Sequence, residues 1–207
     1  MNVKQDYAKD MKELYLPKTT PVIVEVGSMP FIMISGQGDP NGPEFGEVVG
    51  ALYSLAYTIK FSNKGKEVPP GYYEYRVFPL EGIWDLGDTA KPITDKSNYV
   101  YTVMIRQPDF VDQAFFERIR EEVKKKKPNR FLDKAVFKTN TEGTCCQMLH
   151  IGSYDSEPAS FAQMTEFCAQ NGYTRTEMTH REIYLSDPVK TEKSKLKTVL
   201  RFKVSKG

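Results

Sequence analysis

The sequence predicts an α+β fold built from two tandem units, each with the order strand, helix, strand, strand. Three observations indicate it. β-rich runs occur in both halves of the 207 residues, each half carries one apolar pattern with the 3.6-residue period of a helix, and clusters of turn-forming residues separate these segments. Two such units would pair antiparallel sheets about a pseudo-two-fold axis, with helices covering one face and a central ligand groove on the other.

The first half opens with β-rich runs at residues 21–26 and 31–35. A dense group of Gly, Asp, Asn and Pro at 36–43 predicts a turn, and a helix is expected to begin at about Pro43. Its apolar residues recur at offsets of three, four and seven, as in one buried helix face: Phe45, Val48, Val49, Leu52, Tyr53, Ala56 and Ile59.

Two further strands are predicted in this half, at residues 72–78 and 99–106. The connection between them is rich in Gly, Asp and Pro and is predicted to be a loop, although it carries Trp84, the only tryptophan. A tryptophan in a loop needs another part of the protein, or a ligand, to cover it.

The second half repeats this order. A β-rich run at 145–151 precedes an amphipathic helix that contains Phe161 and Met164 and ends at Gly172. Strands at 180–185 and 196–204 complete the set.

These segments divide the chain. Residues 1–20 are polar and of mixed charge and are predicted to be an N-terminal arm, and residues 21–207 are predicted to form a single domain. Its half-repeats span about 21–108 and 138–207, and a helix and a strand at about 109–137 bridge them.

The amino-acid composition excludes some classes of function. The 29 basic and 27 acidic residues leave a net charge of +2, so no strong field draws the chain to nucleic acid or to anionic lipid. No apolar run approaches the roughly 18 residues of a membrane span, and the charged first residues do not resemble a secretory signal. The expected location is the cytoplasm, with no membrane partner and no direct binding of nucleic acid.

No cofactor or metal is expected. The chain has two histidines and three cysteines, an odd number without a metal-ligand spacing. A nucleotide-binding glycine motif, a P-loop and a nucleophile elbow are all missing from the sequence.

One predicted strand carries a candidate site. His180, Glu182 and Tyr184 share a face, and Glu is disfavoured within strands. The alternative is a charge that simply faces solvent on an open sheet.

Other candidates are less specific. Tyr73 and Tyr75 share one face of the predicted strand at 72–78, and tyrosines on both of its faces suggest that some line a cavity or an interface. His150 lies within an apolar run, where a histidine is more often a hydrogen-bonded core residue than a ligand or base.

Five separated segments carry a family resemblance, at residues 78–84, 104–111, 147–154, 182–188 and 196–201. Together they resemble the stand-alone branch of the GyrI-like small-molecule-binding family, and the match runs from about Pro21 to Val204. The resemblance implies two strand-helix-strand-strand units with a central aromatic pocket and an acidic residue. Stand-alone relatives of this kind have been associated with hydrolysis of cyclopropane-bearing DNA-alkylating natural products.

The resemblance also assigns site residues. Glu182 matches the pocket carboxylate and Trp84 the aromatic residue of the loop after the third strand, with Tyr184 and Tyr154 as further pocket residues. The full set of expected ligand-binding residues is Trp84, Tyr154, His150, Tyr73, Tyr75 and His180, and the expected catalytic residues are Glu182 and Tyr184. The family motif often has a second aromatic residue at Asp85 and a second histidine at Arg181, and these departures affect the pocket's expected width and polarity, not the fold.

The implied activity is detoxification of planar electrophiles, and hence drug resistance. Glu182, caged by aromatic residues, would act as general base on a water that opens the cyclopropane, and a tyrosine hydroxyl would donate to the developing oxyanion. The expected partner is a small aromatic or heterocyclic ligand. The alternatives are a non-catalytic binder or sensor of aromatic, including cationic, drugs and a protein that interacts with DNA gyrase. A regulator is disfavoured because no helix-turn-helix precedes Pro21.

Overall fold

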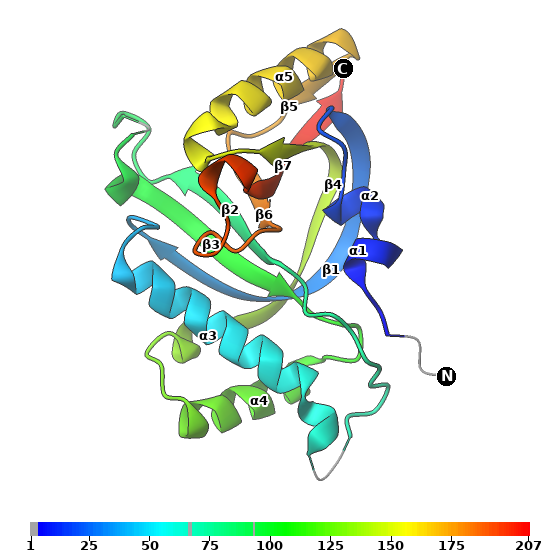
Figure 1. Cartoon of the computed structure of the whole chain (residues 1–207), viewed down its shortest axis with the longest axis vertical. Coiled ribbons are helices and arrows are strands. Elements are labelled where there is room, and N and C mark those ends of the chain that lie inside the picture. The colour runs from blue at the N-terminus through cyan, green and yellow to red at the C-terminus, as the bar shows by residue number, and fades with distance from the viewer. Residues whose placement is uncertain (1–3, 66–67, 93) are drawn as a thin grey trace. The chain divides into compact units, whose positions relative to one another are not determined.

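A computed structural model describes residues 4–65, 68–92 and 94–207 (Figure 1). The chain forms two compact units, which are described separately. The α3 unit contains residues 29–78 and 86–140 together with the described residues before Tyr7, and the α5 unit contains residues 7–28, 79–85 and 141–207. Each unit is named after one helix that it contains, α3 (Pro43–Lys60) or α5 (Glu157–Gln170).

The α3 unit is built on one antiparallel strand pair. β1 (Val22–Gln37) passes from the α5 unit into this one and pairs with β3 (Tyr99–Arg106), from Phe31 opposite Arg106 to Gln37 opposite Val100. Two helices, α3 (Pro43–Lys60) and α4 (Gln113–Lys126), lie side by side in this unit (Figure 1).

Local residues explain where these helices begin. Pro43 occupies the first turn of α3, where a missing N–H costs nothing. The carboxylate of Asp112 accepts a hydrogen bond from the backbone N–H of Phe115 at 2.7 Å, so α4 starts after Asp112 and not after Asp109.

The α5 unit holds an antiparallel sheet. β2 (Leu80–Leu86) pairs with β6 (His180–Tyr184), β6 pairs with β7 (Lys197–Lys206), and β7 also pairs with β4 (Val136–Ile151) and with the short β5 (Tyr173–Arg175).

Helix α5 (Glu157–Gln170) covers one face of this sheet (Figure 1). Its contact with β4 and β7 is an apolar core made of small and medium side chains: Cys146, Met148, Met164, Cys168, Leu200, Phe202 and Val204.

Short helical segments connect these elements. They are α1 (Tyr7–Asp10), α2 (Lys12–Tyr15), and the 3-10 turns η1 (Ser62–Lys64), η2 (Lys96–Asn98), η3 (Leu132–Lys134), η4 (Tyr154–Ser156) and η5 (Lys193–Lys195). None of the helices in the described part of the chain is long and apolar enough to cross a bilayer.

The predicted α+β class with antiparallel sheets is confirmed. In chain order the strands and helices follow strand, helix, strand, strand twice, as β1-α3-β2-β3 and β4-α5-β6-β7, with β5 as an addition and α4 between the two sets. The pseudo-two-fold symmetry and the central groove stay predictions.

One predicted strand is wrong. Residues 72–78 form no ladder, and Tyr75 makes a single parallel bridge with Gln5. The tyrosines of this segment pack their rings on Phe110, so burial of aromatic surface, not strand pairing, accounts for its composition. The strand lies instead at β2, and Trp84 is therefore part of a ladder and not of a loop.

The predicted bridging strand is also not separate. After α4 the chain forms η3 and then enters β4 at Val136, so residues 136–137 belong to the same strand as the predicted run at 145–151. Likewise the runs at 21–26 and 31–35 are one strand, β1, because Met29 and Pro30 remain extended between them.

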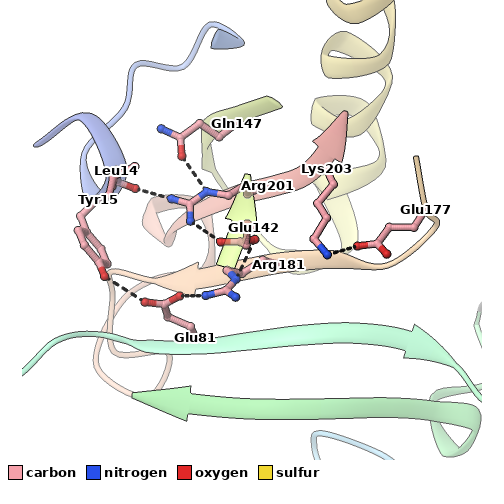
Figure 2. A network of polar contacts seen from close by, with 9 residues as sticks. All are labelled: Leu14, Tyr15, Glu81, Glu142, Gln147, Glu177, Arg181, Arg201 and Lys203. Atoms are coloured by element: carbon pink, nitrogen blue, oxygen red, sulfur yellow. Dashed lines mark hydrogen bonds and ion pairs between the residues drawn. The ribbon is translucent and has the colours of Figure 1, made fainter. Parts of the chain in front are cut away.

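A network of buried charges holds the sheet of the α5 unit on the face opposite to α5 (Figure 2). Arg181 of β6 pairs with Glu81 of β2 at 2.7 Å and with Glu142 of β4 at 3.1 Å, and Arg201 of β7 pairs with Glu142 at 2.9 Å. Gln147 accepts a hydrogen bond from Arg201 at 2.9 Å. Every strand of the sheet except β5 thus contributes to one connected set of ion pairs.

The N-terminal arm completes this network. The Leu14 carbonyl accepts from Arg201 at 3.0 Å, the Glu13 carbonyl accepts from Gln147 at 2.6 Å, and the Tyr15 hydroxyl donates to Glu81 at 3.3 Å. The part of the predicted arm at residues 7–20 is therefore folded onto the α5 unit, whereas residues 1–3 lie outside the described residues.

We expect Arg181→Met to lower the free energy of unfolding by about 3–5 kcal/mol, because it leaves the Glu81 and Glu142 carboxylates buried without their shared cation. Lys203→Met is the matched control. Lys203 pairs with Glu177 where both side chains are partly exposed to solvent (Figure 2), so loss of this ion pair should lower the free energy of unfolding by less than about 1 kcal/mol. Denaturant unfolding of both variants measures the difference, and equal losses would contradict this account.

Candidate functional site

The alternation of side chains along β6 separates two kinds of chemistry. Arg181 points into the charge network, and Glu182 points to the other face, toward α5. Glu182 lies opposite Gly82 on β2 and opposite Leu200 on β7, and Leu200 belongs to the core beneath α5. Glu182 is 9% exposed, so the reading as a solvent-facing charge is wrong.

Three neighbours hold the Glu182 carboxylate. His180 Nε2 lies 3.0 Å from Glu182 Oε1, and the hydroxyl of Tyr184 donates a hydrogen bond to the same carboxylate. The third neighbour is Glu157, which is hydrogen-bonded to Glu182 through its own carboxyl group. A buried carboxylate supported in this way is fixed in position and in orientation.

Trp84 extends this set. Its indole N–H donates to the Tyr184 hydroxyl at 2.8 Å, so a chain of donors runs from Trp84 through Tyr184 to Glu182. Gly82 makes room for it, because a Cβ at this position would lie 2.7 Å from the indole nitrogen of Trp84. The structure thus connects Trp84 to Glu182 through Tyr184 and places Trp84 in a strand, not in the expected loop. The assignment of Trp84 as a ligand-binding residue stays a prediction.

Glu157 is the member that the sequence analysis missed. It is the first residue of α5 and is only 6% exposed. Burial, then the charge of Glu182 and the hydrogen bond to it, raise the pKa of the Glu157 carboxyl to about 10, so Glu157 carries a proton at neutral pH. An acidic residue in the first turn of a helix is common, and for this reason the sequence offers no signal that Glu157 is buried.

Two tyrosines add neutral hydrogen-bond donors. The Tyr154 and Tyr184 rings meet edge to face, with centroids 6.0 Å apart. Burial and the charge of Glu182 raise the pKa of Tyr154 to about 12 and hold that of Tyr184 well above its ordinary value. Tyr154 is 40% exposed, so it lies at the solvent edge of the cluster, whereas the hydroxyl hydrogen of Tyr184 is committed to Glu182.

His150 is placed as a core residue. Its Nδ1 lies 2.9 Å from the Ser160 hydroxyl, and its Nε2 lies 3.1 Å from the Ser153 carbonyl and 3.2 Å from the Ser156 hydroxyl. It is buried and fixes the turn that leads into α5, and with it the position of Glu157. Its role as a ligand-binding residue stays a prediction.

Tyr73 and Tyr75 belong to the α3 unit, where their rings lie 5.5 Å and 6.0 Å from that of Phe110. Tyr75 is buried, and burial raises the pKa of its hydroxyl. Their assignment to a ligand site also stays a prediction.

The carboxyl cluster, as it is called below, combines two buried carboxyl groups with aromatic surface and consists of Glu182, Glu157, Tyr184, Tyr154, Trp84 and His180. Such a combination can accept a proton from a small molecule or water and can hold a planar ligand. Within the described residues no group of three or more His, Cys, Asp and Glu side chains is arranged to hold a metal ion.

We expect the protein to lose stability as the pH rises above neutral, and Glu157→Gln to reduce that loss. An unfolded glutamate loses its proton near pH 4.5, whereas folded Glu157 keeps it up to about pH 10, so the stabilisation is fully present below the lower value and disappears toward the higher one. The wild type should therefore lose about 1.4 kcal/mol more per pH unit than the variant between about pH 7 and pH 9.

Urea denaturation of both proteins across this range measures the difference. The thiols and histidines are common to both proteins and cancel in the comparison. Equal slopes would show that Glu157 is ionised in the folded state.

We also expect Gly82→Ala to disturb the cluster, since the new methyl group cannot coexist with the Trp84–Tyr184 hydrogen bond. Because Trp84 is the only tryptophan of the chain, its fluorescence maximum should shift. Gly50→Ala, where a Cβ meets nothing within 4 Å, is the control and should leave the spectrum unchanged. An unshifted spectrum in Gly82→Ala would show that the hydrogen bond is not formed.

Comparisons with known proteins identify the family of the fold. The model of the GyrI-like small molecule binding domain matches residues 19–205. Among solved structures, a hydrolase from Listeria innocua is similar at 37% identity with a TM-score of 0.92, over 98% of this chain and 100% of that one.

Two further structures extend the comparison. An uncharacterized conserved protein from Listeria innocua is 38% identical, with a TM-score of 0.91 over 98% of this chain and 100% of that one. The EcmrR C-terminal domain shares the fold at 13% identity, with a TM-score of 0.55 over 91% of this chain and 98% of that one. No curated protein matches. The chain therefore belongs to the family of proteins with a GyrI-like small-molecule-binding domain.

Proposed function

We propose that the carboxyl cluster binds a planar, electrophilic small molecule and hydrolyses a strained cyclopropane ring in it, with Glu182 as general base. The observation that carries the proposal is the carboxyl group of Glu182, which is buried and held by Glu157, Tyr184 and His180. A strand interior is a costly place for such a group. Its neighbour Glu157 has a strongly raised pKa, and carboxyl groups with shifted pKa values gather at functional sites.

The comparisons support two parts of this proposal, the binding of a small molecule and a reaction with water. The family match supports binding of a small molecule. The similar Listeria protein is described as a hydrolase, which supports a reaction with water but does not name a substrate. The cyclopropane class comes from the resemblance of five segments of the sequence to stand-alone family members.

The proposed reaction begins with a water molecule next to Glu182. Glu182 removes one proton as the water oxygen forms a bond to the cyclopropane CH₂ carbon. The ring C–C bond breaks, and its electron pair moves through the conjugated system to the carbonyl oxygen, which becomes a phenolate. The proton on Glu182 then leaves for solvent or for the phenolate, so the product is the substrate plus one water.

Tyr154 is the better placed donor for the developing oxyanion. The Tyr184 hydroxyl hydrogen is directed to Glu182, whereas Tyr154 lies at the exposed edge of the cluster and stays neutral because its pKa is about 12. A neutral phenol can donate a hydrogen bond to the forming phenolate and so lower the energy of the transition state. In this mechanism Tyr184 donates a hydrogen bond to the base, Glu182, and Tyr154 donates one to the substrate oxyanion.

A second candidate function is binding without chemistry. A buried carboxylate beside Trp84 and two tyrosines also suits an aromatic cation, which would be held by charge and by the ring faces. This binder would sequester or sense drugs and return them unchanged. Interaction with DNA gyrase is a third possibility that no described contact favours over the first two.

We expect Glu182→Gln to abolish hydrolysis and to keep binding, because the amide preserves the shape of the side chain but is no longer a base. Purified protein and a cyclopropane-bearing alkylator of the duocarmycin type are incubated and followed by liquid chromatography with mass spectrometry. The wild type should give the product with one added water. Loss of at least about 100-fold in rate is expected in the variant.

Trp84 fluorescence titration of the same compound provides the binding control for both proteins. Unchanged turnover in Glu182→Gln would refute the assignment of the base. Intact compound released from wild-type protein after denaturation would favour the non-catalytic binder.

A further inference from the structure

The α3 unit holds a cavity that the proposed function does not use. Its volume is about 220 Å³, and it is lined by the end of α3, by the segment at residues 72–75 and by Lys4. Tyr75 is one of the lining residues and is only 2% exposed, so the cavity extends to a buried part of this unit.

Backbone and side-chain hydrogen bonds fix the walls of this cavity. The Tyr72 hydroxyl donates to the Lys60 carbonyl at 2.8 Å and so holds Tyr72 against the last residue of α3. The Gln5 N–H donates to the Glu74 carbonyl at 2.8 Å, which brings the neighbouring Lys4 to the same place. Three segments that are far apart in the sequence are therefore held together around one cavity.

Positive charge prevails in the lining. Three lining residues are lysines, Lys4, Lys60 and Lys64, and one is an acid, Glu74. The ammonium groups of Lys60 and Lys64 lie 5.8 Å and 4.8 Å from the centre of the Phe61 ring. Burial and then the charge of Lys4 lower the pKa of Lys60, so Lys4 and Lys60 are close enough to repel each other.

The helix dipole explains only part of this arrangement. Cations are favoured at the C-terminal end of a helix, and Lys60 and Lys64 follow that preference at the end of α3. Lys4 comes from a different segment and adds a third charge to the same cavity. Like charges that converge in this way are stabilised by an anion between them.

Unpartnered polar atoms are a second indication of a ligand. The Tyr75 hydroxyl and the Asn63 Oδ1 are both buried without a hydrogen-bond partner, and both residues line the cavity. Such atoms are rare in native proteins and call for a water or a ligand. Because an amide oxygen only accepts hydrogen bonds, a ligand for Asn63 must carry a donor such as a hydroxyl group.

The size of the cavity limits the ligand. A volume of about 220 Å³ is below the roughly 300–1,000 Å³ of sites for drug-sized molecules. Lysine binds phosphate as a point charge, and three lysines suit the double charge of a phosphate monoester.

We propose that this cavity is a second binding site, for a small phosphate monoester that carries free hydroxyl groups, as a sugar phosphate does. The phosphate lies among Lys4, Lys60 and Lys64, and the hydroxyl groups donate to Asn63 and Glu74. This inference does not depend on the proposed function of the carboxyl cluster.

Three probes separate the two parts of the ligand in isothermal titration calorimetry at low salt. Glycerol 3-phosphate has both parts, methyl phosphate has only the phosphate, and glycerol has only the hydroxyl groups. Glycerol 3-phosphate should bind at least about tenfold more tightly than methyl phosphate, because its hydroxyl groups add hydrogen bonds. Glycerol should not bind.

Lysine substitutions locate the site. Lys60→Gln and, at an exposed position, Lys64→Gln should each weaken binding of glycerol 3-phosphate at least about tenfold. Lys138→Gln is the matched control, because it removes the same charge from an exposed position of the α3 unit that does not line the cavity, and it should change the affinity less than about twofold.

Each outcome decides one point. Absence of phosphate binding in the wild type would overturn the inference. An equal loss of affinity in Lys60→Gln and Lys138→Gln would also overturn it, because binding would then follow net charge alone. Equal affinities for methyl phosphate and glycerol 3-phosphate would refute the role of the hydroxyl groups. Hydrolysis of the alkylator should be unchanged in Lys60→Gln, so this test and that of the proposed function fail separately.

Discussion

The buried ion pair between Arg181 and Glu81 is the interaction on which the site depends. It joins neighbouring strands β6 and β2 at 2.7 Å, and neither side chain reaches solvent. Charges of this kind cannot be left unpaired, so the pair permits one register between the two strands. A shift by one residue would place Arg181 under α5 and Glu182 among the buried charges. The register that satisfies Arg181 therefore also directs Glu182 to the opposite face.

The two faces of the sheet manage charge in different ways. On the network face the buried carboxylates of Glu81 and Glu142 meet arginines, and the N-terminal arm supplies backbone carbonyls that complete the hydrogen bonds (Figure 2). On the α5 face two carboxyl groups meet without an arginine or lysine between them, and a proton on Glu157 reduces their repulsion. The first arrangement stabilises the fold, whereas the second costs stability. Costly groups of the second kind are characteristic of sites that perform chemistry.

Membership of the GyrI-like family by itself leaves the chemistry open, because one fold can serve binding and catalysis. In this chain a set of hydrogen-bonding groups surrounds Glu182: Trp84 is connected through Tyr184, and Glu157 is a direct neighbour. A binder of aromatic cations needs a charge and ring faces. A base that activates water would also need a fixed direction, and the proposed function assigns that task to the donors around Glu182.

The sequence alone determined the class of fold, the helices and one face of β6, because apolar and polar residues repeat with the periods of helix and strand. It placed His180, Glu182 and Tyr184 on one face for the same reason. Tertiary structure decided the rest. The tyrosines at 72–78 pack on Phe110 instead of forming a strand. Glu157 looks like an ordinary first residue of a helix, and only its packing against Glu182, 25 positions away in the chain, makes it a neutral acid. Local patterns record periodicity, but a pKa depends on burial and on charges brought close by the fold.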